Sequence, residues 1–189
     1  GMEDEQRKLY LAAHKQLVDQ LQGIDSAYYE KNKIFILSQL TKLRQICCHP
    51  ALCYDDYQGS SAKLEACMEL VQRAVKGKHK VLLFSQFTSM LDLIRERLAE
   101  QNTKYYCLTG NTDKQERQRL VDEFQNDDTP VFLISLKAGG TGLNLTAADI
   151  VIHYDPWWNV AAQNQATDRA HRIGQKNTVT VYRLIAKDS

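Results

Sequence analysis

The sequence predicts an α/β fold in which an open parallel sheet is flanked by helices and preceded by a small helical segment. From residue 80 onward, short apolar runs rich in Val, Ile, Leu and aromatic residues alternate with amphipathic stretches. Before residue 54, apolar residues recur instead at helical spacing. The 189 residues are enough to bury one substantial core beside a smaller appendage.

The first third of the chain is expected to be helical. Apolar side chains recur every three or four residues in the stretches 5–21 and 35–48, and Pro50 closes the second stretch. The side chains expected to face inward are Tyr10, Ala13, Leu17, Leu21, Ile36, Leu40, Leu43 and Cys47. The polar stretch YDDYQGSS, residues 54–61, then marks a boundary between a helical segment, 1–58, and an α/β domain, 59–189.

A third helix is expected directly after this boundary, at the start of the α/β domain. Ser61 is its predicted cap, because a serine hydroxyl can accept a bond from a free backbone N–H in the first turn. Its predicted buried face carries Leu64, Met68, Val71 and Val75.

Five apolar runs are predicted to be strands of one parallel sheet. They are VLLFS (81–85), KYYCLT (104–109), VFLIS (131–135), DIVIHY (149–154) and TVTVYRLI (178–185). Between the first two lies a predicted helix with Leu91, Ile94 and Leu98 inward, and the helix after LTGN is assigned the capping pair Thr112 and Gln115. Ligands of such sheets gather beyond the carboxyl ends of the strands, which here lead into SQFT, GNTDK, LKAGGTGLN and DPWWNV.

Composition excludes little by itself. The formal net charge of +1 gives no global sign of nucleic-acid or membrane binding. No apolar run approaches the roughly 20 residues needed to cross a bilayer, and five irregularly spaced cysteines without a secretory signal indicate reduced thiols in an intracellular protein. Because Gly1 before Met2 is typical of a cleaved expression tag, we expect the chain to be an excised piece of a longer protein.

Two segments suggest anion binding. Gly139, Gly140 and Gly142 in LKAGGTGLN leave backbone amides unshielded for a phosphate, although a plain tight turn explains them equally well, since the P-loop pattern is absent. In QATDRAHRIGQ, residues 165–175, Arg169 and Arg172 share one helical face and can converge on one anion. The alternative is two solvated arginines paired with nearby carboxylates.

Three other features have a plain structural explanation beside a functional one. The run CCHPALC, residues 47–53, carries possible zinc ligands, but it has no second ligand pair, and a buried helix end with His49 as a cap is the default. Trp157 and Trp158 can stack on a base or partner, or can seal a core edge. The run KGKHK, residues 76–80, is interpreted as a solvated helix exit.

Taken together, KVLLFSQFTSMLD, LISLKAGGTGLNL, DPWWN and QATDRAHRIGQ resemble motifs IV, V and VI of the SWI/SNF-type ATPases within the superfamily 2 helicases. Their order and spacing match as well. LTKLRQICCHP, LTGNTDKQERQRLVDEFQ and VYRLI resemble the connecting segments of that family, so the likeness covers nearly the whole chain, and DPWWN resembles bacterial members. The resemblance implies the C-terminal RecA-like lobe of a two-lobed motor, preceded by the family's helical protrusion.

The resemblance also implies roles for individual residues. Arg169 and Arg172 match arginine fingers that reach the γ-phosphate of ATP, and Gln165 opens the same motif. Gly140, Thr141 and Gly142 match the loop that couples nucleotide to DNA. The residues that fall where the family meets the DNA backbone are Ser85, Gln86, Ser135 and Lys137.

Two positions depart from the family pattern. Leu136 stands where many superfamily 2 proteins have threonine, so the neighbouring Ser135 is the candidate hydroxyl there. Lys137 stands where remodelling relatives often have arginine, which keeps the charge but loses bidentate geometry.

The expected function is therefore half of a double-stranded DNA translocase. Neither a P-loop lysine nor an acidic box for Mg²⁺ is identified in the chain, so ATP and Mg²⁺ are expected to be held mainly by a missing N-terminal lobe, the chief partner besides double-stranded DNA. The alternative is a non-catalytic RecA-like module that binds DNA or a protein. A nucleotide-dependent oxidoreductase is disfavoured, because the second strand does not end in the acidic residue expected of that fold.

Overall fold

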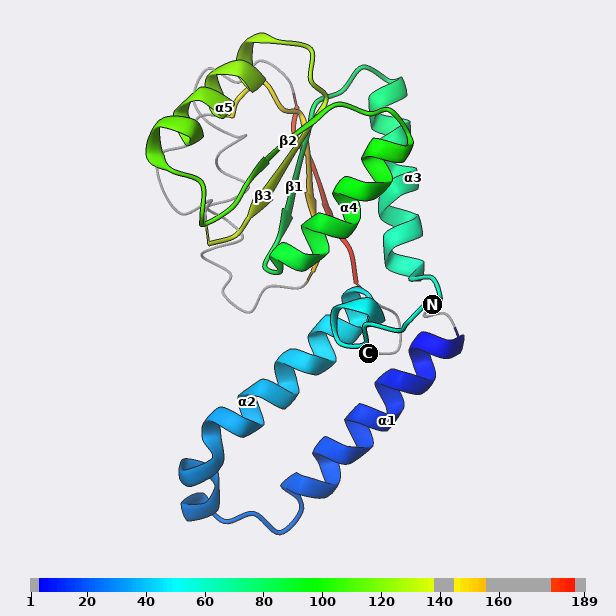
Figure 1. Ribbon diagram of the computed structural model, residues 1–189, viewed down its shortest axis with the longest axis vertical. Helices are drawn as coiled ribbons and strands as arrows, with labels where there is room; N and C mark the ends of the chain where they lie inside the picture. Colours follow the sequence, from blue (N-terminus) through cyan, green and yellow to red (C-terminus); the bar gives the residue numbers. More distant parts are fainter. Residues whose placement is uncertain (1–3, 138–144, 156–177, 186–189) are drawn as a thin grey trace. The chain divides into compact units, whose positions relative to one another are not determined.

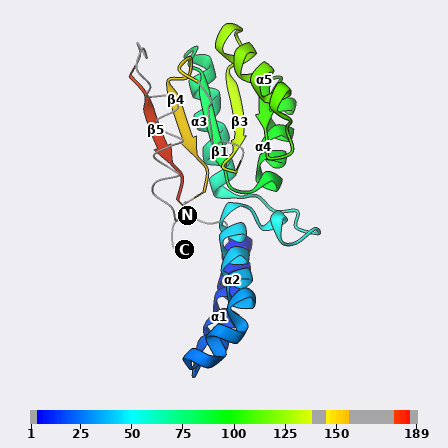
Figure 2. The same ribbon diagram turned by 90° about the vertical axis from the view of Figure 1, so that its left-hand side faces the viewer.

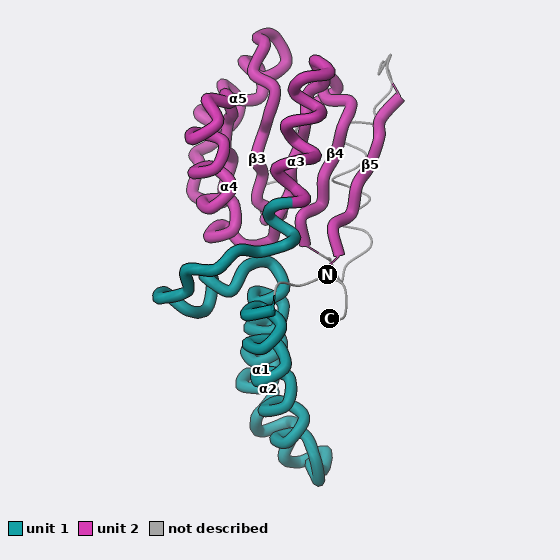
Figure 3. The backbone as a smooth tube through the Cα atoms, turned by 90° about the vertical axis from the view of Figure 1, so that its right-hand side faces the viewer, with its two compact units in different colours: residues 1–65, 186–189 teal, residues 66–185 magenta. Residues whose placement is uncertain are grey.

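The computed structural model describes residues 4–137, 145–155 and 178–185. The chain forms two compact units, one comprising residues 1–65 with 186–189 and the other residues 66–185 (Figure 3). Within the described ranges, no helix is both long and apolar enough to cross a bilayer.

The first unit is built on a pair of helices, α1 (Asp4–Leu21) and α2 (Ser26–Cys48), which run side by side in opposite directions (Figure 1). Their contact buries the expected residues Ala13, Leu17 and Leu43 and also Ile46. Leu21 was expected inward but is exposed, because it is the last residue of α1 and lies at the turn into α2.

Helix α2 begins earlier than the apolar pattern predicts. The Asp25 side chain caps it by accepting a hydrogen bond from the backbone N–H of Tyr28 at 2.8 Å. The first turns carry exposed apolar residues, Ile34 among them, and the backbone is non-helical at Asn32. This part of α2 therefore has no amphipathic stripe, and the spacing of apolar residues in the sequence predicts only the second half of the helix.

The end of α2 confirms the expected cap. His49 precedes a short 3-10 helix, η1 (Pro50–Leu52), and its Nδ1 accepts a hydrogen bond from the backbone N–H of Ala51 at 3.0 Å. Helix α3 (Ala62–Lys76) is capped by Ser61, whose hydroxyl accepts from the N–H of Leu64 at 3.3 Å. The predicted buried face of α3 is correct except at Val75, which is half-buried, while Ala74 is buried instead.

In the described part of the second unit, five parallel strands form one sheet in the order β2-β3-β1-β4-β5. Figure 2 shows β3, β1, β4 and β5 of this sheet side by side. Their bounds are Val81–Ser85 (β1), Tyr105–Leu108 (β2), Val131–Ser135 (β3), Ile150–His153 (β4) and Thr180–Arg183 (β5). All residues of β1, β3 and β4 are buried. The expected open parallel sheet and its five strands are confirmed.

Helices cover both faces of the sheet. Figure 1 shows α3 and α4 (Thr88–Glu100) on one face and α5 (Lys114–Asn126) on the other. Leu91, Ile94 and Leu98 of α4 are fully buried, as predicted. On the α5 face, Phe124 packs edge-on against Phe132 with 5.2 Å between the ring centroids. The other buried residues of this cluster include Leu82, Phe84, Leu108, Leu120, Val121, Ile134 and Val151.

Two local predictions for α5 and its surroundings are wrong. The cap of α5 is Asp113, which accepts from the N–H of Glu116 at 2.8 Å, because the Thr112 hydroxyl is taken by the N–H of Thr109 at 3.1 Å. Lys80 is not solvated. Its ammonium donates to the carbonyl oxygen of Asp127 at 2.7 Å and lies 4.3 Å from the ring centroid of Phe124, and burial lowers the pKa of Lys80.

Candidate nucleic-acid interface

Three adjacent strands bring their carboxyl ends together at one edge of the sheet. β1 lies between β3 and β4, and Ser85 at its end is in register with Ser135 at the end of β3. The backbone N–H of Leu136 donates to the carbonyl of Ser85 at 3.1 Å. The described polar residues that follow these strands, Gln86, Lys137 and Asp155, therefore lie at one edge of the sheet.

A buried carboxylate organises the loop after β1. Asp155 lies two residues beyond β4 and is 2% exposed. One carboxylate oxygen accepts a bond from the Ser85 hydroxyl, and the other accepts from the backbone N–H of Gln86 at 3.1 Å. The Ser85 hydroxyl in turn accepts from the N–H of Phe87 at 3.1 Å. Asp155 thus links the loop after β4 to the whole Ser85–Gln86–Phe87 turn.

The four candidate DNA-contact residues differ in exposure. Lys137 is exposed and Gln86 is half-buried, so both can present donors to a phosphate oxygen. Ser85 and Ser135 are buried at 0% and 3% exposure. Their hydroxyls lie beneath the surface, and the Ser85 hydroxyl donates its hydrogen bond to Asp155 rather than to a ligand.

His153, the last residue of β4, is the most strongly perturbed base of this edge. Its ring is 1% exposed and stacks on Phe84 with the centroids 5.6 Å apart. Burial, and to a smaller extent the positive charge of Arg183 on β5, lower its pKa to about 4. His153 is therefore neutral at neutral pH and adds no positive charge to the interface.

The remaining candidates lie outside the described residues. They are Gly140, Thr141 and Gly142 of the glycine-rich loop, Gln165, Arg169 and Arg172 of the arginine motif, and also Trp157 and Trp158. Their predicted roles stay predictions. The Asp-Glu pairs of the chain, at 4–5 and 122–123, lie within α1 and α5 and not at a strand end.

Sequence reasoning missed Asp155 as a site residue. The signal was present, because Asp155 opens the DPWWN segment directly after a parallel strand, where polar side chains reach the ligand edge. Its partners, Gln86 just after β1 and Ser85 at the end of β1, lie 69 and 70 residues away in the sequence, so pairing them required the strand order.

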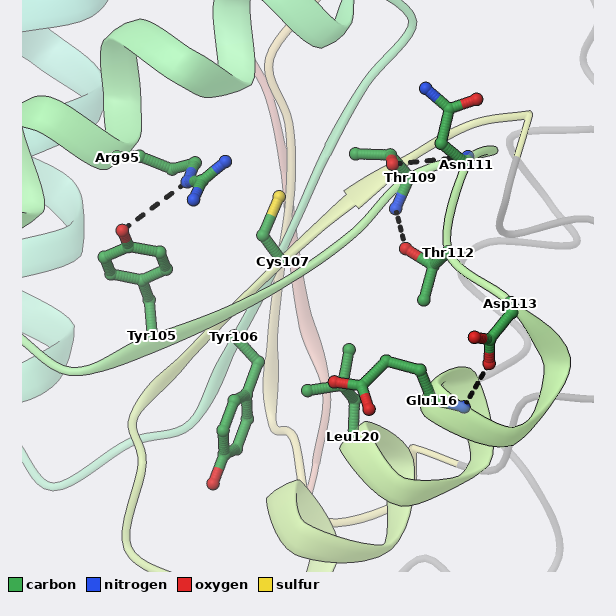
Figure 4. A pocket seen from close by; sticks show the side chains of 10 residues that line it. All are labelled: Arg95, Tyr105, Tyr106, Cys107, Thr109, Asn111, Thr112, Asp113, Glu116 and Leu120. Atoms are coloured by element: carbon green, nitrogen blue, oxygen red, sulfur yellow. Dashed lines mark hydrogen bonds between the residues drawn. The ribbon is translucent and has the colours of Figure 1, made fainter.

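A separate hollow of about 510 Å³ lies along β2, an edge strand of the described sheet, and is also lined by residues 111–113 of the GNTDK loop (Figure 4). Arg95 donates to the Tyr105 hydroxyl at 3.5 Å on one side of it. The threonine and aspartate side chains at its other end close the turn and cap α5. These groups are engaged in local structure, so the hollow does not favour a particular ligand.

Comparison with known proteins shows that this chain is similar to ATP-dependent helicases. Residues 62–174 match the helicase conserved C-terminal domain. An uncharacterized ATP-dependent helicase of Mycoplasma pneumoniae is 42% identical over 187 residues, which cover 97% of this chain and 17% of that protein. The putative ATP-dependent helicase/translocase YwqA of Bacillus subtilis is 44% identical over 188 residues, 96% of this chain and 20% of that protein.

A solved structure extends the similarity to the fold. The SWI2/SNF2 ATPase core of Sulfolobus solfataricus in complex with dsDNA is 37% identical, with a TM-score of 0.82, and the match covers 98% of this chain and 39% of that one. The chain spans 20% or less of the two curated bacterial relatives.

Proposed function

Because this chain belongs to the helicase conserved C-terminal domain family and is of the SWI2/SNF2 type, we propose that it is the C-terminal motor lobe of an ATP-dependent translocase on double-stranded DNA. The two curated relatives described above are ATP-dependent helicases by name, and they are about five to six times as long as this chain. The rest of the motor, including the ATP-binding lobe, then belongs to a longer parent protein.

The observation that carries the proposal is the convergence of β1, β3 and β4 on one polar edge with Lys137 and Gln86 accessible there. A lysine ammonium and a side-chain amide donate to phosphate oxygens without reading base edges. The similar Sulfolobus core was solved in complex with dsDNA. We therefore assign this edge to the DNA backbone, with low sequence specificity and with affinity that falls as salt rises.

We assign the chemical role of this lobe to Arg169 and Arg172. Phosphoryl transfer is catalysed mainly by positioning and by neutralising charge that develops on the γ-phosphate, and a planar guanidinium suits that task. Gln165 and the loop residues Gly140, Thr141 and Gly142 then couple the nucleotide to the DNA grip.

ATP and Mg²⁺ belong mainly to the other lobe in this proposal. Among the residues that the structure describes, no group of three or more His, Cys, Asp or Glu side chains could hold a metal ion. The P-loop lysine that would bind the phosphates is likewise not found in the sequence. This chain on its own is thus expected neither to bind ATP tightly nor to hydrolyse it.

The helical segment over residues 1–58 is proposed as the protrusion that this family places before the lobe, where it would brace a duplex. We infer that the motor moves along duplex DNA without separating its strands, because the chain is similar to remodelling ATPases. The movement would be driven by two lobes whose open and closed states differ in affinity for nucleotide.

Two strand assays on the parent protein test the proposal. A translocase displaces a triplex-forming strand from duplex DNA when ATP is present, but it does not release a strand from a forked duplex. ATP-dependent release of the forked strand at a comparable rate would make the protein an unwinding helicase. Binding to duplex DNA without either ATP-dependent activity would favour the non-catalytic binding module.

A further inference from the structure

Two aspartates bracket β4, one at each end, and each bonds to residues at or next to one end of β1. Asp149 precedes β4, and its carboxylate accepts from the backbone N–H of Lys80 at 3.1 Å and contacts Nδ1 of His79 at 2.6 Å. Asp155 follows β4, and its carboxylate accepts from the N–H of Gln86, also at 3.1 Å, and from the Ser85 hydroxyl. Each aspartate therefore clamps one end of β1 to one end of β4.

The two clamps differ in what they hold. Asp149 lies at the amino ends of the strands, away from the proposed DNA edge, and its side chain is 18% exposed. Asp155 lies at the carboxyl ends, is 2% exposed, and holds the turn that carries Gln86. Only the second clamp is part of the interface.

The Asp155 clamp extends through the turn to the next helix. The Ser85 hydroxyl donates to Asp155 and accepts from the N–H of Phe87, the N-cap residue of α4, whose own side chain forms no capping bond. A buried carboxylate is tolerated only when hydrogen bonds compensate its lost hydration, and such charge-assisted bonds are the stronger ones. The geometry of the Gln86 backbone is thus tied to Asp155.

We propose that Asp155 is a positioning residue for the DNA contact, because its buried carboxylate holds Ser85 and Gln86 so that the Gln86 side chain faces the DNA backbone. The inference rests on the proposed function of this edge. Asp155 does not touch DNA itself, since it is buried and carries the same charge as a phosphate.

The test uses the parent protein with the substitutions Asp155→Ala and Asp155→Asn. The measured quantity is the duplex DNA concentration that gives half-maximal stimulation of ATP hydrolysis, with DNA-independent hydrolysis measured beside it. Asp155→Ala should raise that concentration about tenfold, the size expected for losing one hydrogen bond to a charged group. Asp155→Asn keeps an oxygen for the Gln86 N–H and should fall between Asp155→Ala and the unsubstituted protein.

Asp149→Ala is the matched control. It removes an equivalent clamp from the same pair of strands and should lower the melting temperature, but it should leave half-saturation by DNA unchanged. If Asp149→Ala shifts half-saturation as much as Asp155→Ala, the effect comes from general loosening of the sheet, and the positioning role is wrong.

A double-mutant cycle separates positioning from simple loss of stability. Ser85→Ala should raise half-saturation as well, and the double variant Ser85→Ala with Asp155→Ala should be no worse than the larger single effect, because both break one network. If Asp155→Ala does not fold, Asp155→Asn and Ser85→Ala test the inference instead. The inference is wrong if neither variant changes the DNA concentration that gives half-maximal stimulation. If the unsubstituted protein shows no DNA stimulation at all, the proposed function itself fails.

Discussion

Acid should destabilise this protein through His153. The imidazole is buried at the end of β4 and stacked on Phe84, and burial together with the nearby Arg183 lowers its pKa to about 4. In the unfolded chain the pKa of a histidine is about 6.5. Between these two values the unfolded chain binds a proton that the folded protein does not.

The sign and size of the effect follow from this difference. Because the folded pKa is the lower one, the contribution of His153 to stability is fully present above pH 6.5 and is lost as the pH falls from 6.5 toward 4. Linkage gives a loss of about 2 kcal/mol between pH 7.5 and pH 5. For a chain of this size that corresponds to a fall in melting temperature of about 4–8 °C.

The assay is urea denaturation of the 189-residue chain and of His153→Phe at pH 7.5, 6 and 5. The substitution keeps a flat ring beside Phe84 but cannot titrate, so the variant should lose about 2 kcal/mol less than the original chain over this range. Val151→Ala, which destabilises the same strand without changing a titratable group, should keep the full pH dependence. Equal losses in the original chain and in His153→Phe would show that His153 does not carry the effect.

Two further predictions concern the DNA edge and the cap of α5. Lys137→Ala should weaken binding to all duplex sequences alike and reduce the slope of log affinity against log salt by about one, measured by fluorescence anisotropy; a change in sequence preference would contradict backbone contact. Asp113→Ala should cost about 1 kcal/mol in urea denaturation, and more than Thr112→Ala, because Asp113 caps α5; the reverse order would restore Thr112 as the cap.

The sheet was predictable because buried parallel strands are apolar along their whole length. VLLFS and VFLIS match β1 and β3 residue for residue. Predictions that depended on contacts between distant segments were less accurate. Lys80 was expected to be solvated, since nothing local indicates that the carbonyl of Asp127 and the ring of Phe124 will surround its ammonium.

The candidate site divides in the same way. The strand order confirms that the carboxyl ends of β1, β3 and β4 meet at one edge, which the general rule for parallel sheets predicts. Motif likeness selected Ser85, but it could not reveal that Ser85 is buried and bonded to Asp155. The cluster is formed by the hydrogen bonds of Asp155 to Ser85 and Gln86, which are about 70 residues away in the sequence. The spacing of residues along the chain does not predict such bonds.

The catalytic part of the motor proposal depends on Arg169 and Arg172, and the measurement that tests it is ATP turnover by the parent protein at saturating duplex DNA and ATP. Replacing either arginine by alanine should lower turnover by about a thousandfold or more, while nucleotide affinity and DNA binding stay largely intact, because the lost contact forms only in the transition state. The 189-residue chain alone should show no turnover. Near-normal turnover of both variants, or measurable hydrolysis by the isolated chain, would contradict the assignment of this chain as the lobe that supplies the arginines.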